Sequence, residues 1–407
     1  MKINIKIRLF PQPTETFIVN HITGLLKRGI SLKIFTNSYK GIAAYKNPEI
    51  LEAYDIDRLV NKNFELKSHV PKIFQIIGIL CHFRILKYAV KYYLLRPSKS
   101  LEPIYHLYNY KDFDDSLVCH VQFNTSLKPF LDLTAIGYLN PKKLIITFHG
   151  YDAFRLNKDV FYQNYSKFYN DYVSLVTVNS NYIKSHLVEA GISKHIIKVI
   201  PVGIDVDMYD EFSKYKSNQE IKLVTVGRLI QLKGQKYGMR VLKKLLDLGY
   251  NATYTIVGRG LDDFTEALKE EARMLDCDKN VIFTGYKSQQ ETKKILLDSS
   301  VFLMTSTYDN LTGRQEAFGL VNIEAQACGL PVIAFNTGGV SETIIDRQTG
   351  FLVEDRNVEE MTHKVILLHQ DHNLYTQMRY QARQNALENF DNKKLINQYI
   401  DIYNQIA

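Results

Sequence analysis

A chain of 407 residues is too long for one ordinary hydrophobic core and suits two domains of about 150 to 200 residues each. Apolar residues make up 45% of the chain and charged residues 23%, without a Pro/Gly/Ser-rich tract or a charge block, which excludes an intrinsically disordered protein. The formal net charge of +8 favours an anionic partner such as a sugar nucleotide, a phospholipid surface or nucleic acid, without choosing among them.

The four cysteines have no C-x-x-C spacing, which argues against a zinc site and against a disulfide framework. They are Cys81, Cys119, Cys277 and Cys328. Charged residues interrupt the apolar ones over residues 1–10, so this segment lacks the apolar core of a signal peptide. We therefore expect a protein of the reducing cytosol.

The first half of the chain alternates short β-branched runs with longer amphipathic ones, which predicts βαβ units and a mainly parallel sheet. The predicted strands are Ile3–Leu9, Leu32–Thr36, Leu117–Phe123, Leu144–Phe148, Leu175–Val178 and Lys198–Ile200. Helical stretches such as Thr16–Arg28 and Tyr182–Ala190 lie between them.

One stretch of this half, Val70–Arg96, is both apolar and basic. Its uncharged run is far short of the roughly 20 residues of a membrane-spanning helix, so we do not expect it to cross a bilayer. Arg84, Lys87 and Lys91 share one helical face, which is typical of a helix that lies on anionic lipid beside a lipid-linked acceptor. An amphipathic helix packed on its own domain has the same pattern, and both interpretations stay open.

The second half repeats the alternation after a polar run within Val202–Gln219. Its predicted strands are Lys222–Val226, Thr253–Val257, Val281–Thr284, Val301–Met304, Pro331–Phe335 and Phe351–Val353. We expect an α/β domain over 1–203, a linker over 204–219 and a second α/β domain over 220–390. Open α/β sheets bind ligands beyond the carboxyl ends of their strands, so two such domains facing one cleft suit group transfer.

Two cations follow the first predicted strand of the second half, in a loop that leads into a helix. Arg228 and Lys233 have long side chains that can reach one diphosphate from this loop. The loop has neither the Walker pattern nor G-x-G-x-x-G. Taken alone, the pair could equally be two solvated surface charges.

The segment Arg314–Pro331 carries the stronger signal. A helix is predicted to begin just after Gly319 and to end at Gly329. The amides of Gly319, Leu320 and Val321 would form a phosphate site at the positive end of the helix dipole. We therefore expect the donor phosphates to bind directly after Phe318.

A carboxylate lies on each side of this predicted phosphate site. Glu324 lies one turn into the helix and can accept hydrogen bonds from a ribose diol, while Glu316 precedes the helix and can reach the transferred sugar. Both could instead be solvated surface residues, but the residues around Glu324 are apolar and an isolated buried carboxylate is costly.

Two D-x-D sequences could suggest a divalent metal site. They are Asp55-Ile-Asp57 and Asp205-Val-Asp207. The first lies in a region without a clear nucleotide-binding loop and the second in the predicted linker, and the cationic pair supplies the charge that a metal would provide. We therefore expect no metal and no cofactor.

The segment around Glu316 and Glu324 resembles the E-x(7)-E signature of family 4 glycosyltransferases, and the resemblance extends over nearly the whole chain. It implies the GT-B fold, an α/β architecture of two facing Rossmann-like domains with the active site in the cleft between them. Arg228 and Lys233 match the family's basic pair, which holds the donor diphosphate. Glu316 matches the residue associated with the donor sugar and Glu324 the residue associated with the ribose.

Further segments of the second half are similar to the same family. Val257-Gly258-Arg259-Gly260 is similar to its V-G-x-G turn, and Tyr286 falls where the nucleobase usually packs. Ile200–Asp205 resembles its interdomain P-x-G-[IV]-D stretch. The resemblance also implies that the terminal helical stretch within 391–407 packs back toward the N-terminal domain.

The first half carries the acceptor side of the resemblance. Thr147-Phe-His149-Gly-Tyr-Asp152 resembles the family's T-x-H-G-x-D motif, which implies that His149 contacts the donor sugar. Without the resemblance, a lone histidine is more often structural. Residues 10–17 resemble the F-P-x-x-S-E-T-F opening of exopolysaccharide glycosyltransferases, including colanic acid and amylovoran enzymes. Thr14 replaces the usual Ser beside Glu15, and Gln122 replaces a second His, so the acceptor is the less determined substrate.

The resemblance favours a retaining enzyme that moves a hexose from a nucleotide sugar, with a UDP-sugar ahead of GDP-mannose, to a saccharide acceptor that is lipid-linked, in exopolysaccharide, capsule or O-antigen synthesis. The N-terminal motifs offer no obvious carboxylate nucleophile, which favours same-face transfer. We expect a cytoplasmic location, peripheral at the inner membrane face, and no nucleic acid partner. A non-catalytic nucleotide-sugar-binding subunit and a hydrolysing UDP-GlcNAc 2-epimerase-like enzyme remain alternatives.

Overall fold

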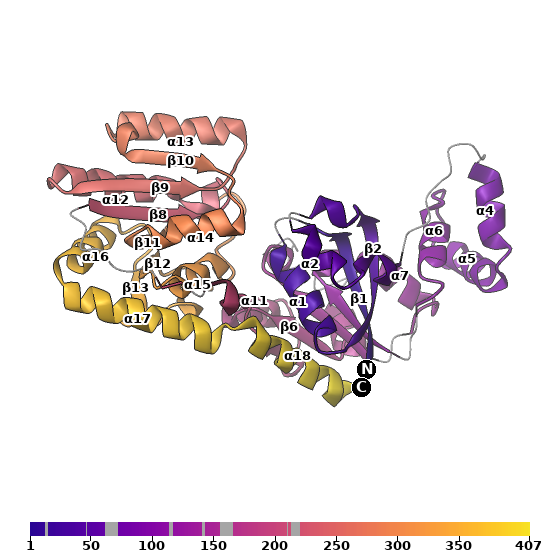
Figure 1. The fold of residues 1–407 in the computed structure, drawn as a ribbon. Coiled ribbons are helices and arrows are strands. Elements are labelled where there is room, and N and C mark those ends of the chain that lie inside the picture. Colours follow the sequence, from indigo (N-terminus) through magenta and orange to yellow (C-terminus); the bar gives the residue numbers. More distant parts are fainter. Residues whose placement is uncertain are drawn as a thin grey trace. The chain divides into compact units, whose positions relative to one another are not determined.

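The chain folds into two compact α/β units (Figure 1). The computed structural model describes residues 1–12, 15–45, 47–61, 72–113, 117–140, 143–154, 166–209, 211–212 and 220–407. The first unit contains Met1–Val178, Lys184–Ile200 and Ile396–Ala407, and the second contains Asn179–Ile183 and Pro201–Leu395.

The first unit is built on a seven-stranded parallel sheet with the order β3-β2-β1-β4-β5-β6-β7. Its strands are β1 Lys2–Phe10, β2 Ser31–Tyr39, β3 Val60–Asn61, β4 Val118–Gln122, β5 Lys143–Phe148, β6 Leu175–Val178 and β7 Ile197–Val199. The central strands β4 and β5 are buried on both faces, as expected for parallel strands covered by helices.

Helices of the first unit connect these strands. They are α1 Thr16–Leu26, α2 Pro48–Glu52, α3 Ile56–Leu59, α4 Lys72–Leu80, α5 Phe83–Leu95, α6 Glu102–Asn109, α7 Lys128–Ala135, α8 Tyr151–Phe154 and α10 Lys167–Tyr172. Two helices extend beyond the unit, namely α11 Asn181–Glu189 and the C-terminal α18 Asn392–Ile406. In Figure 1 the purple helices α4, α5 and α6 stand together as a group.

The second unit has a six-stranded parallel sheet with the order β10-β9-β8-β11-β12-β13. Its strands are β8 Glu220–Val226, β9 Asn251–Val257, β10 Val281–Gly285, β11 Val301–Met304, β12 Val332–Phe335 and β13 Gly350–Val353. Its helices are α12 Gln235–Asp247, α13 Asp262–Met274, α14 Gln289–Leu297, α15 Leu320–Ala327, α16 Val358–Gln370 and α17 His372–Asn389.

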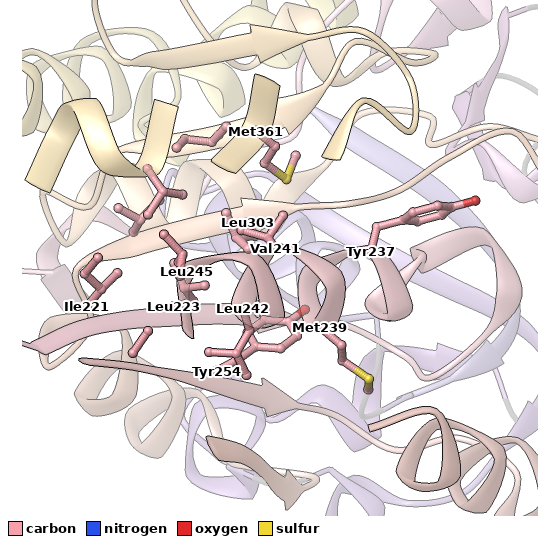
Figure 2. Close-up of a cluster of buried hydrophobic side chains, with 14 of the residues drawn as sticks. Ile221, Leu223, Tyr237, Met239, Val241, Leu242, Leu245, Tyr254, Leu303 and Met361 are labelled. Atoms are coloured by element: carbon pink, nitrogen blue, oxygen red, sulfur yellow. The ribbon is translucent and has the colours of Figure 1, made fainter. Parts of the chain in front are cut away.

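The core of the second unit lies between this sheet and its covering helices. Figure 2 shows Leu223, Tyr254 and Leu303 of the sheet packed against Leu242 of α12 and Met361 of α16. All five are at most 1% exposed. This packing fixes the end of β8, and therefore the position of the loop that follows it.

All of the predicted strands are present, with ends that differ by three residues at most. The additional strand β3 pairs over two residues only, which is too short for a hydrophobic alternation to reveal. The predicted helix from just after Gly319 is α15, whose last turn runs into Gly329 with a φ of +71°.

The stretch Val70–Arg96 contains two helices. Val70 and Pro71 lie outside the described residues, and the part from Lys72 on forms α4 and α5, bent by 107° at the break between them. The buried positions of the two helices, Ile76 and Ile79 in α4 but Ile85 and Ala89 in α5, would point to different sides of one straight helix. The bend lets both sets reach the interior. Within the part of the chain that is described, no single helix is long and apolar enough to span a membrane, although this bent pair passes by length and composition.

Candidate active site

An ion pair between Lys233 and Glu316 forms the centre of the candidate site. Lys233 ends the turn after β8, and Glu316 precedes α15, 83 positions later in the chain. The ammonium donates to Glu316 Oε2, and the side chains are only 14% and 15% exposed. Ser306 donates a second hydrogen bond to the same oxygen at 3.3 Å. The pair is therefore desolvated on most sides but still open to a ligand.

Neighbouring side chains stabilise the ionised form of the Glu316 carboxylate. Burial alone would raise the pKa of this carboxyl group, but the Lys233 ammonium, the Ser306 hydroxyl and the Arg228 guanidinium together lower it below its ordinary value. Glu316 is therefore ionised at neutral pH. An ionised carboxylate can accept hydrogen bonds from sugar hydroxyl groups, which are good donors.

The loop that contains Arg228 and Lys233 depends on glycines at two closely packed backbone positions. Gly258, with a φ of +145°, lies so close to the β8 loop that a Cβ atom would be 1.8 Å from the carbonyl oxygen of Gly227. Gly234 has a φ of +59°, and a Cβ atom there would be 2.2 Å from the carbonyl oxygen of Thr305. Thr305 in turn donates to the carbonyl of Lys233 at 2.9 Å. Both positions require glycine because the backbone conformation and the space exclude a side chain.

Arg228 is placed differently from Lys233. Its backbone carbonyl accepts a hydrogen bond of 2.9 Å from Gln235, which fixes the loop, while its side chain is exposed. Over the described ranges, the guanidinium makes no hydrogen bond or ion pair with the protein, yet its charge acts on Glu316. It is thus available to an anionic ligand beside the Lys233–Glu316 pair.

The start of α15 forms the predicted amide site. Gly319 caps the helix with a φ of +94°, and a Cβ atom there would be 2.8 Å from the Nδ2 atom of Asn322. The amides of Leu320 and Val321 come too early in the helix to have an intrahelical acceptor. Phe318 just before them is 3% exposed and packs on the ring of Phe390, so it anchors the helix start in the core.

Glu324 differs from Glu316 because no lysine or arginine of the described residues forms an ion pair with it. Its side chain is half-buried, and the described residues offer its carboxylate no hydrogen bond or ion pair. Burial raises the pKa of this carboxyl group to about 7. Such an uncompensated acid in a folded protein is unfavourable unless a ligand supplies donors.

Tyr286 follows Gly285 at the end of β10, and its side chain is 49% exposed. The amide of Gly258 donates to the carbonyl of Gly285 at 2.9 Å, so the ends of β9 and β10 are joined. The second unit thus brings together Arg228, Lys233, Gly258, Glu316 and the start of α15, at the carboxyl ends of its strands.

His149 belongs to the first unit, where it follows β5. Its Nε2 is 2.8 Å from Oε1 of Gln122, and its ring contacts those of Phe17 and Phe123, with centroid distances of 4.7 and 4.5 Å. Burial, with a smaller effect of the His21 charge, lowers the pKa of His149 to about 3. The imidazole is therefore neutral, and the Gln122 oxygen requires a proton on Nε2. Its contact with a donor sugar stays a prediction.

Asp152 is fully buried and orients this loop. Its carboxylate accepts backbone hydrogen bonds from His149 at 3.0 Å, Gly150 at 3.1 Å and Asn124 at 2.8 Å. Burial raises the pKa of Asp152 to about 6 against the effect of these bonds. A role as a direct acceptor ligand therefore stays a prediction, whereas the contacts seen are those of a positioning residue.

Of the other two predicted acceptor-side residues, the structure describes Glu15, which lies directly before α1. Glu15 accepts a hydrogen bond of 3.0 Å from Gln12, and burial raises its pKa to about 7 although the Arg8 charge acts against this. Thr14 lies outside the described residues.

A buried network around Tyr403 was not predicted from the sequence. The Tyr403 hydroxyl of α18 lies 2.6 Å from Nδ1 of His120 and 3.2 Å from Nε2 of His21. The Nε2 atom of His120 lies 2.6 Å from the hydroxyl of Thr147 in β5, the strand that directly precedes His149. The expectation for the terminal stretch 391–407 named the N-terminal domain as its neighbour but none of these side chains.

Comparisons with known proteins agree with this geometry. The profile of "Glycosyl transferases group 1" matches residues 208–385, and that of "Glycosyltransferase Family 4" matches residues 14–208. An uncharacterised 41.2 kDa protein of the cps region of Klebsiella pneumoniae is 30% identical over 239 residues, which are 56% of this chain and 60% of that protein. The amylovoran biosynthesis glycosyltransferase AmsK of Erwinia amylovora is 24% identical over 91% of both chains.

Solved structures show the same fold. A glycosyltransferase from Rickettsia africae superposes with a TM-score of 0.71 at 21% identity. The match covers 100% of this chain and 98% of the Rickettsia chain. Anabaena HepE in complex with UDP has a TM-score of 0.72 at 17% identity and covers 99% of both chains. The predicted α/β fold of GT-B class is therefore confirmed. The two family profiles follow one another along the sequence, and together they match residues 14–385. The chain therefore belongs to the family 4 glycosyltransferases.

Proposed function

We propose that this glycosyltransferase transfers a hexose from a UDP-sugar to a saccharide acceptor with retention of configuration. The desolvated Lys233–Glu316 pair beside the exposed Arg228 guanidinium carries the proposal. Two cations and the amides of Leu320 and Val321 suit a diphosphate, and the carboxylate of Glu316 suits the sugar attached to it. Glu324 would accept hydrogen bonds from the ribose, and Tyr286 would pack on the base.

The same residues support transfer without a metal ion. As the bond between the sugar and the diphosphate breaks, negative charge develops on the leaving phosphate, and Arg228 and Lys233 would stabilise it. The acceptor hydroxyl would attack from the side that the phosphate leaves, and that phosphate would take its proton. His149, with its pKa of about 3, would contact the sugar as a neutral imidazole and not as an acid.

The names of similar proteins support the choice of substrates. The similar HepE structures hold UDP, or UDP-glucose, and AmsK is named for amylovoran biosynthesis. Other relatives are named as GDP-mannose-dependent enzymes, so the base is the first property to test. The name of AmsK supports a saccharide acceptor in exopolysaccharide, capsule or O-antigen synthesis, and we propose that this acceptor is carried on a lipid.

The first test combines nucleotide binding with turnover. We expect UDP and a UDP-hexose to raise the melting temperature by mass action more than GDP and GDP-mannose do. We also expect the protein to hydrolyse or transfer from that donor in the presence of EDTA. Tight binding without turnover over a panel of donors and acceptors would instead favour a regulatory subunit. Conversion of UDP-GlcNAc to its epimer without an acceptor would favour the epimerase alternative.

We further propose that the enzyme is cytoplasmic and rests on the inner face of the cell membrane through α4 and α5. Ile85 and Ala89 of α5 are buried in the unit, but the face with Phe83, Leu86, Val90 and Leu94 is exposed, Phe83 by 81%. Residues 72–101 contain six lysines and arginines and no acidic residue. An apolar stripe beside cations is complementary to anionic lipid.

Sedimentation with vesicles tests this surface. We expect the protein to bind vesicles of phosphatidylcholine and phosphatidylglycerol in equal parts, but not phosphatidylcholine alone. Phe83→Ser together with Leu94→Ser should weaken binding by roughly 100-fold or more, because each buried side chain contributes about 1.5 to 3 kcal/mol. Leu248→Ser, at an exposed leucine of the second unit, is the matched control. Equal binding by the double variant and the control would contradict the proposal.

A further inference from the structure

A polar cavity in the first unit has no role in the mechanism above. It has a volume of about 200 Å³ and lies between β1, the second half of β2 and α6. Its lining residues are Lys6, Phe35, Thr36, Asn37, Glu102, His106, Asn109 and Tyr110. All of them belong to the first unit, which is the acceptor side in the proposed function.

Lys6 is the most unusual of these residues. It lies in the middle of β1, only 1% exposed, between the fully buried Ile5 and the almost fully buried Ile7. Its ammonium donates to Oδ1 of Asn37, and the described residues supply no carboxylate to pair with it. Burial lowers the pKa of Lys6 to about 7, offset only in part by Cys119. The amine is therefore only partly protonated at neutral pH, and an anion bound in the cavity would favour its charged form.

Tyr110 contributes a second donor to the same cavity. The residue is 4% exposed, and its hydroxyl is buried without a hydrogen-bond partner in the described structure. The Lys6 ammonium lies 5.5 Å from the centre of the Tyr110 ring. Buried polar groups are nearly always satisfied, so the unsatisfied hydroxyl of a residue that lines the cavity calls for an acceptor atom that the described residues do not supply. An ammonium and a hydroxyl that line one cavity suit the oxygens of a carboxylate or a phosphate.

A second cavity adjoins the first and shares three lining residues with it, namely Asn37, Glu102 and His106. Its volume is about 340 Å³, which is within the range of small-molecule sites. It adds the Arg8 cation, the Tyr92 ring, the hydroxyl groups of Ser98, Ser100 and Thr125, and the carboxylate of Asp132, which is paired with Arg96. Hydroxyl groups, a carboxylate and an aromatic ring together suit a sugar ring.

We propose that these joined cavities form an acceptor subsite for an acidic saccharide, in which Lys6 and Tyr110 bind a carboxylate or phosphate group and the larger cavity holds the sugar ring. The identification of the ligand as the acceptor rests on the proposed function. The two sources of the oxyanion, a uronic acid and a sugar phosphate, share one recognition chemistry.

Calorimetric titration of the full chain with glucuronate, glucose 6-phosphate and glucose tests the subsite. We expect at least one of the two acidic sugars to bind at least tenfold more tightly than glucose, and the tighter one identifies the source of the oxyanion. Lys6→Met should weaken that binding by about 10- to 100-fold and Tyr110→Phe by about five- to tenfold. Lys2→Met, at an exposed lysine of the same strand, should leave it unchanged.

Two results would overturn the proposal: glucose binding as tightly as both acidic sugars, or unchanged binding by Lys6→Met. Misfolding is excluded by a melting curve, since Met replaces a buried cation with an apolar side chain of similar length and should not destabilise the unit. The UDP-induced rise in melting temperature should be the same in Lys6→Met as in the wild type. If the wild type shows no such rise but binds the acidic sugar, the proposed donor chemistry fails while the subsite stands.

Discussion

Replacement of Glu316 by Gln is expected to lower the rate of sugar transfer by roughly 100- to 1,000-fold, while the donor dissociation constant changes by less than about tenfold. The amide can still accept a hydrogen bond from Lys233, so the loop after β8 keeps its place. It cannot supply the negative charge that, in the proposed function, would face the transferred sugar and orient the Lys233 ammonium toward the leaving phosphate. Initial rates at saturating donor, together with calorimetric donor binding, separate the two quantities.

Glu354→Gln is the matched control, because Glu354 is an exposed glutamate of the same unit. Its rate should equal that of the wild type. A melting curve shows whether the Glu316 variant is folded, since loss of charge from a desolvated ion pair can itself destabilise a protein. Folded Glu316→Gln protein with unchanged turnover would show that the assigned site is wrong.

Elements of the fold could be predicted from the sequence where their own residues carry the pattern, and not where the pattern depends on residues far away in the chain. Strands such as β6 and β11 are short apolar runs buried on both faces, so their own residues identify them. The bend between α4 and α5 depends on which of their residues meet the rest of the unit. That is a property of tertiary packing, which the helical pattern of the segment does not reveal.

The same division applies to the candidate sites. Glu316 and Glu324 lie eight residues apart around one helix start, so a local motif reveals them. Tyr403 meets His120 across 283 positions of the chain, without any local signal. Lys6 was missed for another reason. The polar residues of β1 alternate with isoleucines, which is typical of a strand with one solvated face, but Lys6 lines a cavity closed by α6.

Glu324 allows a prediction in which stability and binding change in opposite directions. Burial raises its pKa to about 7, so the folded chain keeps a proton that the unfolded chain releases above its ordinary pKa. At acidic pH the protonated Glu324 leaves the free energy of unfolding undiminished. This contribution to stability is lost as the pH rises toward 7. At pH 8 the ionised carboxylate is destabilising. Glu324→Gln should therefore melt at a higher temperature than the wild type at pH 8, with no difference near pH 4.

The same variant should bind UDP about 10- to 100-fold more weakly, because hydrogen bonds from the ribose to a charged acceptor are lost. Wild-type UDP binding near pH 7 should release a proton, since the ribose hydroxyls favour the ionised carboxylate. Titrations in two buffers with different ionisation enthalpies measure that proton, and it should be absent in Glu324→Gln. Glu388→Gln, at an exposed glutamate of α17, is the control for both measurements. If the Glu324→Gln protein is more stable but binds UDP with unchanged affinity, Glu324 is a buried structural acid. A residue kept for its ligand should instead gain stability and lose nucleotide affinity when it is replaced.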